Sequence, residues 1–136
     1  MSEKHSAAVV ALSAHFPVVA PIEIRFRDLD ALGHVNNAVY LSYLEVARIA
    51  YYRRLGWDGR QNSFGFVVVN ICIDYRSPLF LEDRVLVGIK VSKMGHSSFT
   101  FTYEMRSETD NRLIATAKSV QVTVDESQSH SIPVPE

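Results

Sequence analysis

The sequence contains almost no cysteine, no long apolar run and no excess of charge of either sign. Its one cysteine, Cys72, excludes an intrachain disulfide and a cysteine-based zinc site. Cys72 lies within a run of β-branched residues, so we expect a small buried thiol rather than a reactive nucleophile. The formal net charge of −1 gives no overall attraction to nucleic acid or to an anionic membrane. An anionic ligand would have to be held by local groups.

Neither a targeting segment nor a membrane span is predicted. Every apolar stretch is far shorter than the roughly 20 residues that a membrane-spanning helix needs. The stretch from Met1 to Pro17 holds one short apolar segment, Ala7 to Leu12, and no clear cleavage site, which argues against a signal peptide. We therefore expect a cytoplasmic protein that acts without a membrane or nucleic-acid partner.

The composition is that of an ordinary globular protein, because 47% of the 136 residues are hydrophobic and 21% are charged. This length fits one domain, which we expect to cover residues 1–136. The two ends, residues 1–16 and 125–136, are predicted to be flexible.

The spacing of the apolar residues changes twice along the chain. Residues 18–27 alternate as a strand does, turn formers fill residues 28–34, and a helical period runs from Asn36 or Asn37 to Leu55. This helix is so broadly apolar that we expect protein to surround most of it. Four more strands are predicted, at residues 64–75, 85–92, 99–105 and 112–124. Short turns between them favour antiparallel pairing, so we predict an α+β fold with one sheet curled around one long helix.

A dense group of polar residues precedes this helix, from Asp28 to Asn37. The first N–H groups of a helix lack intrahelical acceptors and lie at the positive end of its dipole, so they can stabilise an oxyanion. A carboxylate a few residues upstream can act as base or nucleophile. Gly33 would let the backbone approach a ligand closely. Taken alone, such a group is more often a helix cap than a site.

Three stretches of the chain follow one family pattern. They are Phe26-x-Asp28-x-Asp30-x-x-Gly33-His34-Val35-Asn36-Asn37-x-x-Tyr40-x-x-Tyr43-x-Glu45-x-Ala47-Arg48, then Tyr75-Arg76-Ser77-Pro78-Leu79 with Asp83, and Gly95-x-Ser97-Ser98-Phe99. Together they closely resemble the 4-hydroxybenzoyl-CoA thioesterase branch of the hotdog superfamily, which includes the YbgC-like acyl-CoA thioesterases. The resemblance implies the hotdog fold, in which a curved antiparallel sheet of about five strands wraps one long central helix.

The resemblance also implies a function and a set of site residues. Asp30 matches the catalytic aspartate of the family, and Asn37 matches the position whose backbone N–H polarises the thioester carbonyl. The residues implied to bind substrate are Gly33, His34, Val35, Asn36, Tyr40 and Ser98. The implied reaction is hydrolysis of an acyl- or aroyl-CoA to the free acid and coenzyme A, without cofactor or metal. The implied partner is a second identical chain, in a homodimer or homotetramer whose active sites lie between protomers.

Some of these residues have other plausible roles. Asp28 is expected to cap a turn or pair with Arg25 or Arg27 rather than to react. His34 could position substrate or water, or it could be a hydrogen-bonded structural histidine. No second histidine or carboxylate falls at ligand spacing on the helix, so a metal site is not predicted.

The helix carries a second candidate acid, Glu45. It lies three residues before Arg48, so we expect an ion pair between them on a polar helix face. A helix carboxylate is catalytic in a different hotdog branch, which makes Glu45 the runner-up catalyst. Two other functions stay open on the same fold. One is a non-catalytic protein that binds acyl-CoA or acyl-carrier protein, and the other is a dehydratase.

Overall fold

The structure is a computed structural model of the 136-residue chain and describes residues 6–57 and 65–124. In chain order the elements are α1 (Ala7–Ser13), β1 (Val18–Ile22), the 3-10 helix η1 (Phe26–Asp28), the 3-10 helix η2 (Asn37–Val39), α2 (Tyr40–Arg54), β2 (Phe66–Tyr75), β3 (Val85–Met94), β4 (Ser98–Ser107) and β5 (Leu113–Thr123). Of the predicted strand at residues 64–75, Phe64 lies outside the described residues.

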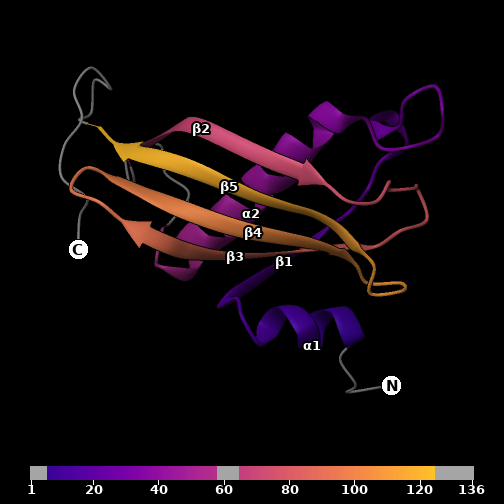
Figure 1. The fold of residues 1–136 in the computed structure, drawn as a ribbon, viewed down its shortest axis with the longest axis horizontal. Coiled ribbons are helices and arrows are strands. Elements are labelled where there is room, and N and C mark those ends of the chain that lie inside the picture. The colour runs from indigo at the N-terminus through magenta and orange to yellow at the C-terminus, as the bar shows by residue number, and fades with distance from the viewer. Residues whose placement is uncertain (1–5, 58–64, 125–136) are drawn as a thin grey trace.

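The strands form one antiparallel sheet in the order β1-β3-β4-β5-β2. Figure 1 shows α2 lying across one face of this sheet. Ala47 of α2, Ile89 of β3 and Phe101 of β4 are fully buried in the core between helix and sheet. The predicted hotdog fold is therefore confirmed. The first strand ends at Ile22, five residues earlier than expected, because η1 turns the chain before Asp28.

The central helix begins and ends at residues that favour those positions. Asn36 is the N-cap of η2, which runs directly into α2, and its Oδ1 accepts a hydrogen bond from the Ala38 N–H at 2.8 Å. Gly56 follows the helix with a φ of +106°, a left-handed conformation that glycine adopts without strain. The inner face is buried, but Val46 and Leu55 on the outer face are 45% and 62% exposed. The helix is thus covered on one face only, and the expectation that protein surrounds most of it is wrong.

Within the first of the two ends expected to be flexible, the described residues 6–16 contain the short helix α1, while residues 1–5 and the second end, 125–136, lie outside the described residues. Ser6 caps α1 by accepting a hydrogen bond from the Val9 N–H at 3.1 Å. Ala8 and Leu12 are fully buried in a second apolar cluster beside β3. Alternate residues of β3 face α2, so this cluster lies on the opposite face of the sheet. No helix in residues 6–57 and 65–124 is long and apolar enough to cross a membrane.

Strand β2 is one edge of the sheet, and within the described residues it pairs only with β5. Val68 and Val69 are exposed on it, and so is Tyr75 at its end. Cys72 is exposed as well, which corrects the expectation of a buried thiol, because β2 has no neighbour on its outer side in these residues. A long apolar edge strand is a template for pairing with another chain.

Candidate active site

A cleft of about 420 Å³ lies where the loop before η2 meets the C-terminal end of β2. We call it the Asp30 cleft, and its lining residues are Asp30, Leu32, His34, Val35, Asn37, Tyr40, Tyr75, Arg76, Ser77 and Pro78. The structure thus brings together five of the predicted site residues, the exceptions being Gly33, Asn36, Ser98 and the runner-up Glu45.

The Asp30 carboxylate is fixed by its own turn. Its Oδ1 accepts hydrogen bonds from the Leu32 N–H at 2.9 Å and the His34 N–H at 3.2 Å. The Gly33 N–H donates to the Asp30 carbonyl at 3.1 Å, and the φ of +82° at Gly33 explains the glycine in this turn. Asp30 is exposed, and no cation of residues 6–57 or 65–124 forms an ion pair with it. The carboxylate is therefore oriented without being neutralised.

Asn37 lines the same cleft at the start of η2. Among the described residues its backbone N–H has no hydrogen-bond acceptor, whereas the next amide, that of Ala38, is capped by Asn36. The Asn37 carbonyl accepts a hydrogen bond from the Tyr75 hydroxyl at 2.9 Å, which ties the helix start to the end of β2. Asn36 itself acts as the cap and not as part of the cleft wall.

Asp28, two residues before Asp30, faces the protein interior. Its Oδ2 accepts hydrogen bonds from the Tyr43 hydroxyl at 2.8 Å and the Arg25 N–H at 3.0 Å, and its Oδ1 from Arg25 Nη2 at 3.2 Å. Burial raises the pKa of Asp28, but these hydrogen bonds outweigh it and hold the pKa below its usual value. Burial, and then the bond to Asp28, raise the pKa of Tyr43. The prediction of a structural Asp28 is confirmed, with Arg25 and not Arg27 as its partner.

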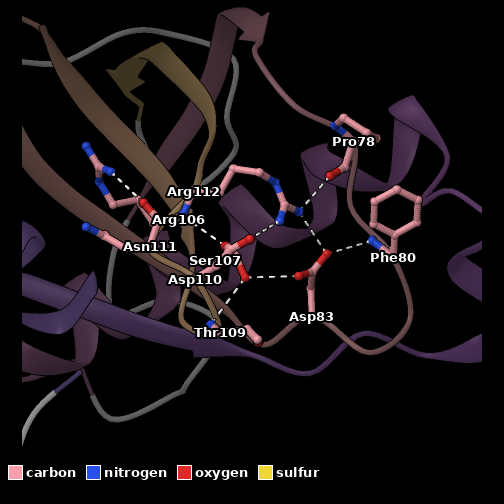
Figure 2. A network of polar contacts seen from close by, with 9 residues as sticks. All are labelled: Pro78, Phe80, Asp83, Arg106, Ser107, Thr109, Asp110, Asn111 and Arg112. Atoms are coloured by element: carbon pink, nitrogen blue, oxygen red, sulfur yellow. Dashed lines mark hydrogen bonds and ion pairs between the residues drawn. The ribbon is translucent and has the colours of Figure 1, made fainter. Parts of the chain in front are cut away.

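The outer wall of the cleft is held by a polar network that the sequence did not indicate (Figure 2). Arg112 Nη2 donates hydrogen bonds to the Pro78 carbonyl and to Asp83 Oδ2, each at 3.0 Å. Asp83 Oδ2 also accepts from the Phe80 N–H at 2.9 Å, and its Oδ1 accepts from the Ser107 hydroxyl at 3.0 Å. The network clamps residues 78–83 to the β4–β5 turn. Asp83 belongs to the family pattern, but its partner is 29 residues away in sequence.

The clamped loop in turn contacts the Asp30 turn. Its Leu79 carbonyl accepts a hydrogen bond from the Val35 N–H at 2.9 Å. The rings of Phe80 and His34 meet edge to face, with centroids 5.1 Å apart. His34 is therefore held through both its backbone and its ring, beside Asp30.

Tyr40 is a buried residue of the cleft lining. Its ring meets that of Tyr75 edge to face, with centroids 4.9 Å apart. Burial, and then Tyr75, raise the pKa of Tyr40 to about 12, so its hydroxyl stays neutral near pH 7.

Ser98 lies at the other end of the sheet. Val122 of β5 pairs with Ser98 on one side and with Val67, near the start of β2, on the other. The Asp30 cleft contains Tyr75, at the opposite end of β2. Ser98 is thus not brought to Asp30 within one chain.

Glu45 lies in a second cleft, of about 430 Å³, which we call the Arg48 cleft. Its lining residues are Glu45, Arg48, Ile49, Tyr52, Trp57, Phe66, Val67, Val68 and Gln121. The predicted ion pair between Glu45 and Arg48 is wrong, because Arg48 turns inward and its Nη1 donates to the Tyr103 hydroxyl at 3.1 Å. Within one chain, the runner-up acid and the Asp30 cleft are separate.

The residue types at the Asp30 cleft suit acyl transfer. The cleft joins an unneutralised carboxylate and a helix-start amide, the groups needed to attack a carbonyl and to stabilise its oxygen. Among residues 6–57 and 65–124, no group of three or more His, Cys, Asp or Glu side chains could hold a metal ion.

Known proteins resemble this chain along most of its length. A family model described as the thioesterase-like superfamily matches residues 24–136. The long-chain acyl-CoA thioesterase FadM of Escherichia coli K12 is 33% identical over 114 residues, which cover 76% of this chain and 80% of FadM. The acyl-CoA thioesterase YbgC of Haemophilus influenzae is 28% identical over 117 residues, which cover 83% of this chain and 86% of YbgC.

A solved structure points to the same family. A thioesterase from Thermus thermophilus, determined in complex with coenzyme A and zinc, matches with a TM-score of 0.80 at 39% identity. The match covers 89% of this chain and 87% of that one. The resemblance found in the sequence is confirmed, and with it the predicted class of enzyme, a thioester hydrolase. The chain belongs to the thioesterase-like superfamily.

Proposed function

We propose that this protein is an acyl-CoA thioesterase that hydrolyses an acyl- or aroyl-CoA to the free acid and coenzyme A at the Asp30 cleft. The observation that carries the proposal is that Asp30 and Asn37 line one cleft, while among the described residues the Asp30 carboxylate has no ion-pair partner and the Asn37 N–H has no acceptor. The named activities of FadM and YbgC, and the coenzyme A bound to the Thermus protein, support the substrate class.

In the proposed reaction the thioester carbonyl oxygen accepts a hydrogen bond from the Asn37 N–H. Two routes then fit the cleft. Asp30 can attack the carbonyl carbon, which expels the coenzyme A thiolate and leaves a mixed anhydride that water hydrolyses. Alternatively, Asp30 takes a proton from a water molecule that attacks the same carbon, and the thiolate leaves as before. Both routes consume one water molecule and need no cofactor or metal.

Label in the Asp30 carboxylate after a single turnover in oxygen-18 water identifies the anhydride route. If hydrolysis of the anhydride occurs at the Asp30 carbonyl, the label appears in the Asp30 carboxylate. If Asp30 is a general base, the label appears only in the acid product. Mass spectrometry of the peptide that contains Asp30 reads the difference.

We also propose that the chain works as a homodimer, which could associate further into a tetramer. Strand β2 is ten residues long, is an edge of the sheet and exposes Val68 and Val69. Antiparallel pairing of two β2 strands across a two-fold axis would cover these side chains and join the two sheets. Sedimentation that shows a stable, fully active monomer would contradict the dimer.

A thiol-release assay over short, long and aromatic acyl-CoAs tests the proposed activity. Release of coenzyme A at a rate proportional to enzyme concentration supports the thioesterase. The alternative is a protein that binds acyl-CoA or acyl-carrier protein without catalysis. It would show thermal stabilisation by the ligand with no thiol release, and that result would displace the proposal.

A further inference from the structure

Hydrogen bonds within the turn before α2 fix the peptide groups on both sides of the Asn37 N–H. The Asn36 N–H donates to the Asp28 carbonyl at 2.8 Å, and the Asn36 carbonyl accepts from the Val39 N–H at 2.9 Å. The Ala38 N–H donates to Asn36 Oδ1 at 2.8 Å. In the described part of the chain, the Asn37 N–H is thus the amide of residues 36–38 that stays available.

One contact to this turn comes from a distant part of the chain. The Tyr75 hydroxyl donates a hydrogen bond to the Asn37 carbonyl at 2.9 Å, across 38 positions in the sequence. Figure 1 shows the C-terminal end of β2 at the same end of the sheet as the start of α2. Each peptide group is planar, and only two dihedral angles separate it from the next one. The direction of the Asn37 N–H therefore depends on where the neighbouring peptide group, with its bonded carbonyl, is held.

Tyr75 is itself held firmly enough to act as such an anchor. It is the last residue of β2 and pairs with Ala115 of β5. The next residue, Arg76, continues the attachment, because its N–H donates to the Ile114 carbonyl at 2.8 Å. The ring of Tyr75 packs edge to face on that of Tyr40, with centroids 4.9 Å apart. The hydroxyl thus reaches Asn37 from a position that both the sheet and the helix support.

The hydrogen bond of Tyr75 also limits what its hydroxyl can do in the cleft. Tyr75 lines the Asp30 cleft, so a direct contact with substrate is conceivable from its position alone. A phenolic hydroxyl has one proton to donate, and that proton is used on the Asn37 carbonyl. It cannot be donated to the thioester oxygen at the same time. Tyr75 therefore acts on the reaction through Asn37.

Resting on the proposed thioesterase function, we infer that Tyr75 is a positioning residue for the donor that stabilises the oxyanion. Its hydroxyl aligns the Asn37 N–H before the substrate binds. Negative charge develops on the carbonyl oxygen only as the carbon is attacked, so an aligned donor stabilises the transition state more than the bound thioester. Tyr75 therefore contributes to kcat and little to KM.

Tyr75→Phe tests this role, because it removes the hydroxyl and keeps the ring that packs on Tyr40. Steady-state thiol release is measured on octanoyl-CoA and on benzoyl-CoA. We expect kcat to fall by about 10-fold, less than the roughly 10²–10³-fold lost with a whole oxyanion donor, and KM to stay within about 2-fold. An unchanged kcat, or a raised KM at an unchanged kcat, would overturn the inference.

Tyr51→Phe is the matched control, since it removes one phenolic hydroxyl from a half-buried tyrosine of the same helix. The Tyr51 ring packs on Phe101, with centroids 5.0 Å apart, and Tyr51 does not line the Asp30 cleft. Both kcat and KM should equal those of the wild type. An equal fall of kcat in Tyr51→Phe and Tyr75→Phe would mean that the loss is not specific to Asn37, and the inference would fail.

Nitrogen-15 relaxation of the backbone amides gives a readout that does not depend on activity. In Tyr75→Phe the amides of Asn37 and Ala38 should become more mobile than in the wild type, because their shared peptide group has lost one of its anchors. The amides of Leu32 and His34, which bind Asp30, should not change. The same mobility at Asn37 and Ala38 in both proteins would contradict a positioning role.

Replacement of Tyr75 by 4-aminophenylalanine provides the rescue. This residue restores an N–H donor at nearly the same place, so it should recover most of the kcat lost in Tyr75→Phe. 4-Fluorophenylalanine is close to tyrosine in size but donates no hydrogen bond, so it should not. If Tyr75→Phe does not fold by circular dichroism, these two replacements are compared with each other, and equal kcat values would overturn the inference.

The Asp30→Asn variant separates this inference from the function on which it rests. If Asp30→Asn hydrolyses both substrates at the wild-type rate, the proposed catalytic role of Asp30 is wrong, and the positioning role fails with it. If Asp30→Asn is inactive and Tyr75→Phe keeps the wild-type kcat, only the positioning role of Tyr75 is wrong.

Discussion

The segment before η2 has an inner half, residues 25–29, and an outer half, residues 30–36, and each half uses its aspartate in a different way. Asp28 is 2% exposed, and both of its carboxylate oxygens accept hydrogen bonds from Arg25 or Tyr43. Asp30 is exposed, and only amides of its own turn bind its carboxylate among the described residues. An acid whose charge is matched by its neighbours supports the fold, and an acid that is only oriented is available for chemistry.

The largest expected effect is that of Asp30→Asn on turnover. The asparagine Oδ1 can still accept hydrogen bonds from the Leu32 and His34 amides, so the turn should keep its shape while the base or nucleophile is lost. We expect kcat to fall by about 10²-fold or more, the usual range for losing a general base. The thiol-release assay measures this loss, and an unchanged melting temperature serves as the folding control. Turnover near that of the wild type would show that Asp30 is not catalytic, and the two aspartates would then not differ in role.

Asp28→Asn should act on stability instead. The amide cannot accept all three hydrogen bonds that the buried carboxylate accepts from Arg25 and Tyr43. We expect the free energy of unfolding to fall by about 1–3 kcal/mol, the cost of leaving buried polar groups unpaired. Urea unfolding of the wild type and Asp28→Asn measures the loss. A stability equal to that of the wild type would contradict the structural role of Asp28.

The expected effect of replacing Arg112 is intermediate, because its hydrogen bonds to Pro78 and Asp83 hold the wall of the cleft and not the reacting groups. Arg112→Gln should free residues 78–83 and lower kcat/KM by about 10-fold, within the range that misplacement of a binding wall produces. Asp110→Asn is the matched control, since it removes only the exposed partner of Arg112 Nη1, which lies 2.7 Å away, and should leave kcat/KM unchanged. Equal losses of kcat/KM in both variants would show that the contacts of Arg112 to Pro78 and Asp83 do not support the cleft wall.

The smallest expected effect is in the pH dependence of stability. The pKa of Asp28 is lower in the folded protein than in the unfolded chain, so its ionised form stabilises the fold. This contribution is fully present above the unfolded pKa of about 4 and is lost as the pH falls through the lowered folded value. The difference in unfolding free energy between wild type and Asp28→Asn should therefore shrink below about pH 4. A difference that is constant from pH 7 to pH 3 would contradict the assignment.

The residues that local rules govern were predictable from the sequence. Asn36 caps η2, and Gly33 closes the turn of Asp30. Both contacts join residues only two or three positions apart, so the residue types in the local sequence indicate them. Asp30 and Asn37 are seven residues apart, so the family motif and the loop geometry indicate the same cleft.

Features that depend on distant partners were not predictable in this way. Helical periodicity places Arg48 beside Glu45 on a polar face, but the Tyr103 hydroxyl, 55 residues away, draws it into the core. Arg112 contacts Pro78 across 34 residues, and no local pattern marks that pairing. The exposure of Cys72 follows from the position of β2 at the sheet edge, which strand order alone decides.

The most direct test of the account is a crystal structure with an acyl-CoA analogue in which a methylene group replaces the thioester sulfur. We expect its carbonyl oxygen to lie about 3 Å from the Asn37 nitrogen, with the carbonyl carbon facing the Asp30 carboxylate. An analogue that binds with its carbonyl outside the Asp30 cleft would contradict the central claim that this carboxylate and this amide act on one thioester.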